Sequence, residues 1–267
     1  MLTLFDPRSI CDLALAWGLF FAASTAILVG LGLAWERSAA GRRRRIFAMP
    51  VPAGQHRREA AANLGFVVLA TAAFTAAIAG GLLRADAVGV GPALATFVVC
   101  LVGFEVYYYF QHRALHTRAL VRFHRWHHAS RITTPLSGQS LGVVEAAGWI
   151  GGLVLFPAIL TQIGVLHAGA LVTYLLASAA GNILGHANAE PHPGASGRRE
   201  RSWATHPFTY HALHHARWTG HFGLGTTVLD RLLGSEWPDW PELHARVVAG
   251  RPMRSFKEHG GRGPDAQ

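Results

Sequence analysis

Five long apolar segments constrain the fold of this 267-residue chain more than any other feature of its sequence. A helix needs about 20 predominantly apolar residues to cross the hydrocarbon core of a bilayer, which is about 30 Å thick. Hydrophobic residues make up 51% of the chain and charged residues only 15%, which is typical of membrane proteins. We therefore expect an all-α, polytopic membrane bundle of about five spans, at residues 11–35, 62–83, 92–110, 141–164 and 167–185.

The arginines are distributed unevenly between the connecting loops. The loops at 36–61, 111–140 and 186–267 are basic, whereas those at 84–91 and 164–167 are short and nearly neutral. Because cytoplasmic loops carry the excess of Lys and Arg, we expect an outside N-terminus, a cytoplasmic C-terminus and a bacterial inner membrane. The net charge of +9 is then explained by topology and by anionic lipid headgroups, and we expect no nucleic-acid partner.

Histidine occupies 16 positions, and half of them fall in three short motifs. An HxxxH motif spans 112–116, and HxxHH motifs span 124–128 and 211–215. Residues three and four apart lie on one face of a helix, with Cβ atoms about 5–6 Å apart, so each motif directs its imidazoles to one point. Neutral imidazole is the commonest metal ligand and suits zinc, copper, iron and nickel. Eight such rings are too many for one ion, so the motifs predict two metals in a cytoplasmic helical cap.

A further histidine ends the fifth apolar segment. His186 leaves the bilayer on the same side as the three motifs, and we expect it to be a ninth ligand. Asn182 shares its helical face and is a candidate ligand, either directly or through water. We interpret His192 and His206, in the polar loop 187–209, as solvated or adjacent to ligands, with metal ligation as the alternative, and we exclude His167 as lying on the outer side. The predicted ligands are His112, His116, His124, His127, His128, His186, His211, His214 and His215.

Two carboxylates lie within the apolar segments. Glu105 precedes His112 by seven residues, and Glu145 lies near the start of the fourth segment. Intramembrane carboxylates are rare and usually functional. Each could orient a metal ligand, line a substrate passage or form a structural hydrogen bond to a neighbouring helix, and the sequence leaves these readings open.

The chain divides into three parts. We expect membrane helices and a basic loop in residues 1–90, a histidine-motif catalytic domain in 91–235, and a polar tail in 236–267 that is disordered from 254 onward. Cys11 and Cys100 both lie in apolar segments, and we expect both to be buried free thiols.

The order of these motifs resembles the fatty acid hydroxylase superfamily, also called the sterol desaturase family. The resemblance runs from about residue 95 to 235 and includes a closing signature in His211-Ala-Leu-His214-His215-Ala-Arg, His221-Phe-Gly and Leu229-Asp-Arg-Leu-Leu-Gly234. The chain departs from the family pattern at Asn182, where some relatives have a histidine, and at His221, where the usual residue is Asn. Asp230 and Arg231 either pair to fix the tail beneath the site or form a surface ion pair.

The resemblance implies a diiron oxygenase that hydroxylates or desaturates a fatty acyl, sterol-like or other isoprenoid lipid with O₂. It also implies two Fe ions at the nine histidines, with zinc as an expected substitute in purified protein. No fused electron-transfer motif is visible, so a separate donor of ferredoxin or cytochrome b5 type, with its reductase, would supply electrons. The alternatives are a membrane zinc carrier or zinc hydrolase that uses the same histidines, and a bis-histidine haem protein.

Overall fold

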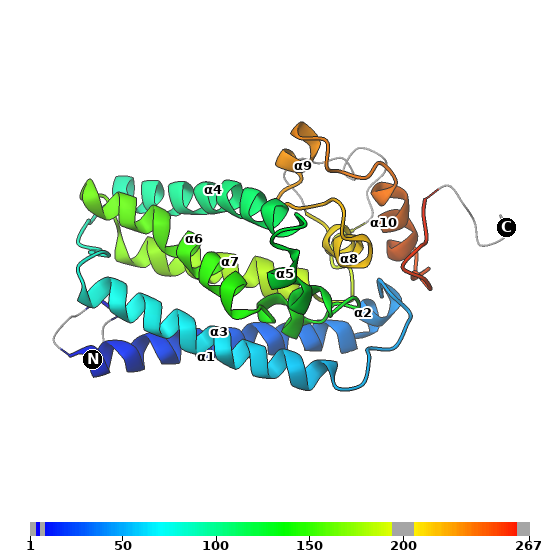
Figure 1. The fold of residues 1–267 in the computed structure, drawn as a ribbon, viewed down its shortest axis with the longest axis horizontal. Coiled ribbons are helices and arrows are strands. Elements are labelled where there is room, and N and C mark those ends of the chain that lie inside the picture. Colours follow the sequence, from blue (N-terminus) through cyan, green and yellow to red (C-terminus); the bar gives the residue numbers. More distant parts are fainter. Residues whose placement is uncertain (1–3, 6–8, 194–205, 261–267) are drawn as a thin grey trace.

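The computed structural model describes residues 4–5, 9–193 and 206–260, and these residues form helices and loops without β-strands. Five of the helices are long and apolar enough to cross a membrane. They lie side by side in one bundle (Figure 1). The prediction of an all-α membrane bundle is confirmed. Its five long helices are α1 Ile10–Arg37, α3 Gln55–Ala79, α4 Val90–Leu115, α6 Val143–Gln162 and α7 Ala168–Gly185.

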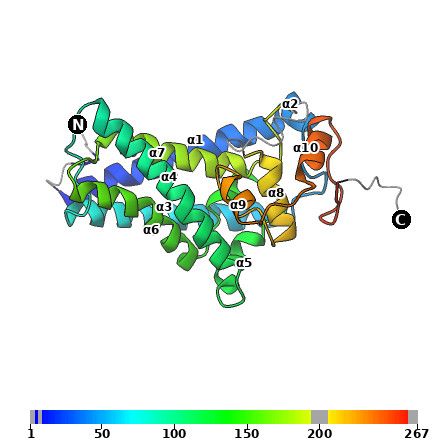
Figure 2. The ribbon, with the colours of Figure 1, turned by 90° about the horizontal axis from the view of Figure 1, so that it is seen from above.

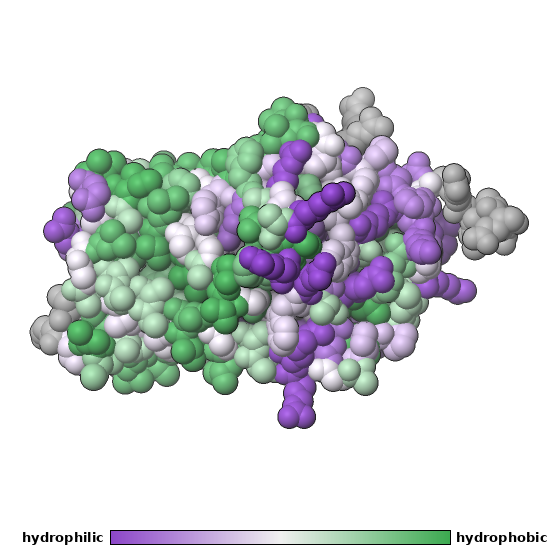
Figure 3. All heavy atoms as spheres, in the orientation of Figure 1, coloured by the Kyte–Doolittle hydropathy of each residue, from purple (hydrophilic) through white to green (hydrophobic). Residues whose placement is uncertain are grey.

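The bundle is held together by apolar and aromatic side chains between these helices. Helix α1 packs on α3 and α7, and α4 packs on α6 and α7. Trp17 and Phe74 meet at a ring-centroid distance of 4.8 Å in one part of the core, and Phe104 and Trp149 meet at 5.3 Å in another. The outward faces are also apolar, with large side chains such as Leu19 and Val68 exposed. Because lipid tails solvate such side chains, this surface fits a bilayer (Figure 3).

The two ends of the bundle differ in their connections. At one end two short turns meet, where the backbone N–H of Ala87 donates to the carbonyl of Leu166. His167 lies at this end, where its ring accepts a hydrogen bond from the N–H of Ala170 at the start of α7. The other end carries the long basic loops, and hydrophilic side chains concentrate there (Figure 3). All the long connections therefore leave the bundle at a single end.

At that end shorter helices form a cap over the bundle (Figure 1). The cap has its own hydrophobic core around Phe47, Tyr210 and Trp240. Helix α5 projects to one side, as the perpendicular view shows (Figure 2). The cap and its connections contain α2 Ala39–Arg43, α5 Val121–His128, the 3₁₀ helix η1 Pro135–Gln139, α8 Phe208–Arg217, α9 Val228–Leu232 and α10 Trp240–Val248.

The expectation that both cysteines are buried is wrong for Cys11. Both thiols are free, and Cys100 is buried in the bundle, but Cys11 is exposed. Cys11 lies in the first turn of α1 beside Ile10, which is 64% exposed, so this turn faces outward. An apolar segment identifies a span but not which of its faces packs against protein.

Of the tail for which we expect disorder, residues 254–260 lie within the described part of the chain. The carbonyl of Glu258 accepts a hydrogen bond from Arg217, and the N–H of Gly260 donates to Asp239. Residues 261–267 lie outside the described residues.

Candidate metal centre

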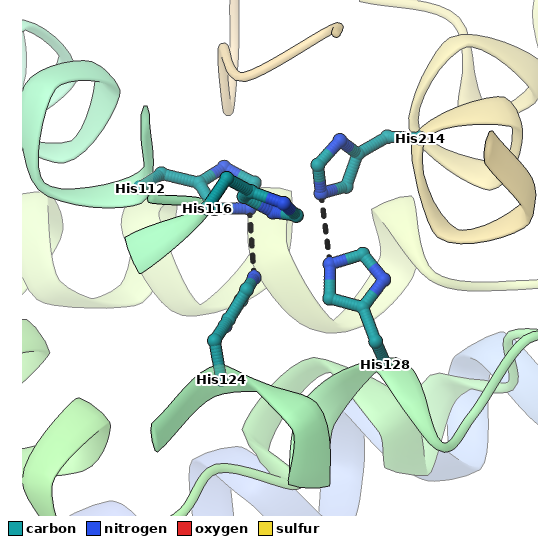
Figure 4. Close-up of side chains that lie close together, drawn as sticks. All are labelled: His112, His116, His124, His128 and His214. Atoms are coloured by element: carbon teal, nitrogen blue, oxygen red, sulfur yellow. Dashed lines mark hydrogen bonds between the residues drawn. The ribbon is translucent and has the colours of Figure 1, made fainter. Parts of the chain in front are cut away.

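The nine histidines gather in two adjacent groups beneath the cap. Within each group every residue offers a nitrogen atom, and these atoms lie within 4.8 Å of one another. Eight of the nine side chains are buried, and His116 is partly buried. The first group is His112, His116, His124, His128 and His214 (Figure 4), and the second is His127, His186, His211 and His215.

Four segments of the chain deliver these rings, namely the end of α4, α5, the end of α7 and α8. Helix α4 continues beyond its apolar part to Leu115, so it carries His112 and leaves His116 at its end. Helices α5 and α8 each present the three histidines of an HxxHH motif on a buried face. On α5 the opposite face exposes Arg122 and Arg125, which explains why this short helix is amphipathic.

The spacing of the ring nitrogens fits shared metal ions. Two nitrogens at about 2.0–2.1 Å from one ion lie roughly 2.9–3.4 Å apart at octahedral or tetrahedral angles. In the first group the Nε2 atoms of His112 and His124 are 3.2 Å apart, and those of His128 and His214 are 3.1 Å apart. In the second group Nε2 of His186 lies 2.9 Å from that of His211 and 3.4 Å from that of His127.

Acceptors behind the rings hold four of them in this orientation: three are backbone carbonyls, and the fourth is the carboxylate of Glu145 behind His124. Nδ1 of His112 donates to the carbonyl of Phe222 at 2.9 Å, and Nδ1 of His214 donates to that of Gly220 at 2.6 Å. Nδ1 of His186 donates to the carbonyl of Asn182 at 2.6 Å. A hydrogen bond at Nδ1 selects the tautomer whose Nε2 lone pair is free to bind a metal. The four Nε2 atoms are therefore presented as ligand atoms.

Burial favours the neutral form of five of these rings. It lowers the pKa of His127, His128 and His215 well below the usual range, and the neighbouring imidazoles lower it further. The same causes lower the pKa of His116 to about 3, and burial lowers that of His186 to about 4. Neutral imidazole is the form that ligates metals.

The two groups are in direct contact. The rings of His128 and His215, one from each group, have centroids 4.7 Å apart, and those of His127 and His128 are 5.7 Å apart. Neither group contains a cysteine or a carboxylate. In addition, the buried Nε2 atoms of His116 and His215 have no hydrogen-bond partner among the described residues. This donor set suits two neighbouring ions of a metal that accepts imidazole, such as iron or zinc.

Glu145 explains one ring orientation that the sequence left open. Its Oε1 accepts a hydrogen bond from Nδ1 of His124 at 2.7 Å, and both side chains are buried. Glu105, in contrast, contacts no histidine of the two groups. It accepts hydrogen bonds from the N–H groups of Gly225 and Thr226 at 2.9–3.0 Å, so it anchors the loop before α9 to α4.

The other candidate residues lie outside the two groups. The side-chain amide of Asn182 donates to the carbonyl of Gly138, so this residue contacts η1 and supports His186 only through its own carbonyl. His192 donates to Glu190 and is partly exposed. The ring of His206 lies 6.0 Å from that of His211, and burial lowers its pKa to about 4.

The expected pairing of Asp230 with Arg231 is wrong. Asp230 is fully buried and accepts hydrogen bonds from the N–H groups of Phe222 and Gly223 and from the hydroxyl of Ser235. Arg231 instead pairs with Glu236 at 3.0 Å. Neighbouring residues on a helix do not face each other, which is why the pair does not form.

His221 adopts a left-handed backbone conformation in the closing segment. Its φ is +59°, in the region where Asn, Asp and His are enriched among residues other than glycine. The imidazole stacks on Tyr210 with centroids 3.5 Å apart, and its Nε2 accepts a hydrogen bond from the N–H of Trp237. His221 therefore connects α8 to the tail without joining the histidine groups.

The sequence did not single out two further residues at the site. Glu190 is fully buried and accepts hydrogen bonds from the N–H and hydroxyl of Thr209 in the first turn of α8. Burial alone would raise the pKa of Glu190, but these bonds and those from His192 lower it overall. The indole of Trp218 covers His128 at a centroid distance of 4.4 Å. A solitary Glu in a loop and a Trp after a helix give no sequence signal of these contacts.

Comparison with known proteins identifies relatives of this chain. The family model described as fatty acid hydroxylase matches residues 97–235. The very-long-chain aldehyde decarbonylase GL1-6 of Oryza sativa subsp. indica is 30% identical over 160 residues, which are 57% of this chain and 25% of the relative. GL1-7 of Oryza sativa subsp. japonica, named as the same activity, is 27% identical over 172 residues, 59% of this chain and 26% of the relative. The chain thus spans about a quarter of the length of these relatives. No solved structure shows a significant match.

Proposed function

Because this chain belongs to the fatty acid hydroxylase family, we propose that it is a membrane-bound diiron oxygenase that hydroxylates or desaturates a lipid with O₂ and external electrons. The observation that carries the proposal is the meeting of nine histidines in two touching groups at one end of five candidate spans. We assign all nine as ligands, five to one iron and four to the other.

Two iron ions held by these rings would supply the chemistry that removes hydrogen from an unactivated C–H bond. The protein residues bind, orient and shield. Glu145 and three backbone carbonyls fix the rings through Nδ1, and Trp218 covers His128. Eight of the nine histidine side chains are buried, so the cap shields them from water. A site closed to water suits a reactive oxidant.

The substrate is proposed to approach from the membrane. A row of aromatic rings connects the bundle core to the first histidine group. The ring centroids of Trp149 and Tyr108 are 4.9 Å apart, and those of Tyr108 and His112 are 5.0 Å apart. An acyl chain or isoprenoid is solvated by the same lipid that contacts the outer faces of these helices. Electrons would arrive from a separate ferredoxin or cytochrome b5 type protein on the cap side, which we place in the cytoplasm of a bacterium.

A second substrate class is suggested by the relatives alone. The rice proteins are named as very-long-chain aldehyde decarbonylases, so a long-chain aldehyde is a candidate substrate for the same histidine groups. The remaining alternative, a zinc carrier or zinc hydrolase, has less support. Within the described part of the spans, Glu105 and Glu145 are both committed to hydrogen bonds, whereas a transported ion needs ionisable residues along its path.

Metal analysis and lipid analysis together test the proposal. The chain is produced in iron-supplemented cells and purified in detergent, its metals are measured by mass spectrometry, and the lipids of producing and non-producing cells are compared. We expect about two iron ions per chain and a new hydroxylated, desaturated or shortened lipid that depends on O₂.

The double variant His127→Ala, His128→Ala should lose both the iron and the new lipid. His259→Ala is the matched control, because it removes a histidine of the same end whose side chain is 60% exposed and lies outside both groups. Bound zinc with no iron after iron supplementation, together with unchanged lipids and unchanged aldehydes, would support the carrier or hydrolase instead.

A further inference from the structure

A cavity of about 280 Å³ opens at the cap end of the bundle, apart from the two histidine groups. The end of α1, helix α2 and the loop that follows it form one side, and residues just after α5 form the other. None of the nine histidines lines it. The lining includes Leu33, Arg37, Arg42, Arg45, His56 and Thr133.

The charge of this cavity is strongly positive. Three arginines and one histidine line it, against the single carboxylate of Glu36. That carboxylate accepts a hydrogen bond from the N–H of Asn188 at 2.7 Å, which fixes it on the cavity wall. Arg37 and Arg45 are exposed, and among the described residues their guanidinium groups make no hydrogen bond, although the charge of Glu36 attracts both. Their donors are therefore open to a ligand in the cavity.

Thr133 provides an independent indication of a ligand. It is only 1% exposed, it lines the cavity, and its Oγ1 has no hydrogen-bond partner among the described residues. The neighbouring Thr134, by contrast, donates to Glu59 at 2.8 Å. Burying a hydroxyl without a hydrogen-bond partner is unfavourable, so an acceptor oxygen of a ligand in the cavity would offset that loss.

The position of the cavity identifies where the ligand comes from. Leu33 and Arg37 belong to the last two turns of α1, at the end of its apolar segment. Between them Trp35 donates its indole N–H to the carbonyl of Ala189 and is placed as an interfacial tryptophan would be. Leu33, Met49 and Val51 add an apolar side to the cationic lining. This combination occurs where lipid headgroups meet hydrocarbon.

We propose that this cavity binds a phosphate group at the membrane surface, carried by the headgroup of an anionic lipid or present as free phosphate. Arg37 and Arg45 would donate charge-assisted hydrogen bonds to its oxygens, and Thr133 would donate its hydroxyl. The apolar residues beside them favour the lipid form, since they can cover the glycerol and the first carbons of an acyl chain. The inference is independent of the reaction assigned to the histidines.

A bound phosphate would also brace the metal centre from outside. Thr133 follows His128 by five residues, and Asn188 follows His186 by two, so both walls of the cavity are continuous with histidine-bearing segments. Glu59 joins the same region, because it accepts hydrogen bonds from Ser130, Thr134 and Ser137. We expect ligand binding to raise the thermal stability of the whole cap.

Native mass spectrometry of the full chain in detergent tests this site. Phosphatidylglycerol, phosphatidylcholine and inorganic phosphate are titrated separately, and the first bound equivalent is quantified. We expect phosphatidylglycerol to bind at least tenfold more tightly than phosphatidylcholine. Tighter binding of phosphatidylglycerol than of inorganic phosphate identifies the lipid as the source, and equal binding identifies free phosphate. No preference for phosphatidylglycerol over phosphatidylcholine, with no binding of inorganic phosphate, overturns the proposal.

Variants distinguish a specific phosphate site from general electrostatic attraction. Arg37→Gln with Arg45→Gln should weaken the first equivalent at least tenfold, whereas Arg118→Gln with Arg122→Gln, which removes two exposed arginines outside the cavity, should leave it unchanged. Equal losses in the two pairs would refute the site. Thr133→Val keeps the side-chain volume, so it serves where the arginine variant does not fold. Without ligand, this variant should be at least as stable as the parent. The ligand should stabilise it less than it stabilises the parent. Equal stabilisation of variant and parent would also refute the site.

Discussion

At the scale of single residues, the acceptor behind each imidazole determines what the ring can do. Three of the four anchored rings donate to backbone carbonyls, which substitution cannot remove. His124 is the exception, because its acceptor is the side chain of Glu145. A carboxylate acceptor fixes the ring and also increases the basicity of the nitrogen that faces the metal. Glu145 is therefore the support of the centre that mutation can test most directly.

Glu145→Leu should lower the affinity for the metal by about 10–100-fold, the usual cost of losing such a partner. The measurement is iron retention against a graded chelator, with the far-ultraviolet circular dichroism recorded on the same samples. Glu145→Gln retains an acceptor for Nδ1 but not the charge, so it should fall between the parent and the Leu variant. If the folded Leu variant retains iron as tightly as the parent, the carboxylate does not support the ligand.

At the scale of elements, η1 reaches its place because a glycine allows it to lie against α7. A Cβ at Gly138 would lie 2.9 Å from the carbonyl oxygen of Asn182 and 3.0 Å from Cα of Ile183. Both neighbours are helix backbone and cannot move independently. The carbonyl of Gly138 in turn accepts the hydrogen bond from the side chain of Asn182. The contact therefore holds η1 beside the helix that ends at His186.

Gly138→Ala should destabilise the protein by about 1–3 kcal/mol, because one added methyl group overpacks this contact. The loss is measured by denaturant unfolding in mixed micelles. Gly151→Ala is the matched control, since an added Cβ there meets nothing within 4 Å and the residue also lies within a helix, α6. Equal stability of the two variants would show that η1 is not packed closely on α7.

The cap is also held by an ion pair whose pH dependence has a definite sign. Arg217 at the end of α8 donates two hydrogen bonds of 2.8 Å to Asp239 just before α10. Burial alone would raise the pKa of Asp239, but Arg217 lowers it to about 2 from the usual 3.8. The folded-state pKa lies below the unfolded value. The pair's contribution is therefore complete above about pH 4 and disappears as the pH falls towards 2.

Asp239→Asn should consequently cost stability at pH 6 and progressively less between pH 4 and pH 2. The difference in unfolding free energy between parent and variant is the quantity to follow, since the other titrating groups largely cancel in it. We expect about 1 kcal/mol at pH 6 for this partly buried pair. A difference that stays constant down to pH 2 would mean that the charge of Asp239 contributes nothing to the cap.

At the scale of the whole molecule, the parts that the sequence could predict are those encoded locally. The five spans follow from length and apolar composition. The position of the imidazoles of each motif on one helical face follows from helical spacing. The partners of Glu145 and Glu190 depend on segments that meet only after folding. Glu145 and His124 are 21 residues apart, and Glu190 and Thr209 are 19 apart, so no local pattern marks them. The outward turn at Cys11 is unpredictable for the same reason, because periodicity is weak in a helix that is apolar on all sides.

The orientation of the bundle in the membrane is the remaining property of the whole molecule, and it can be tested by labelling. Val88 is 83% exposed in the loop at the end opposite the two histidine groups, and Ala119 is exposed in the loop between the first two histidine motifs. Each is changed to cysteine in a background of Cys11→Ser, because Cys11 is exposed and would react, whereas Cys100 is buried. The basic loops at the histidine end predict that this end is cytoplasmic. In spheroplasts of a bacterial host, a membrane-impermeant maleimide should label Val88→Cys at once and Ala119→Cys only after permeabilisation. The reverse order would place the metal centre outside and remove access to a cytoplasmic electron donor.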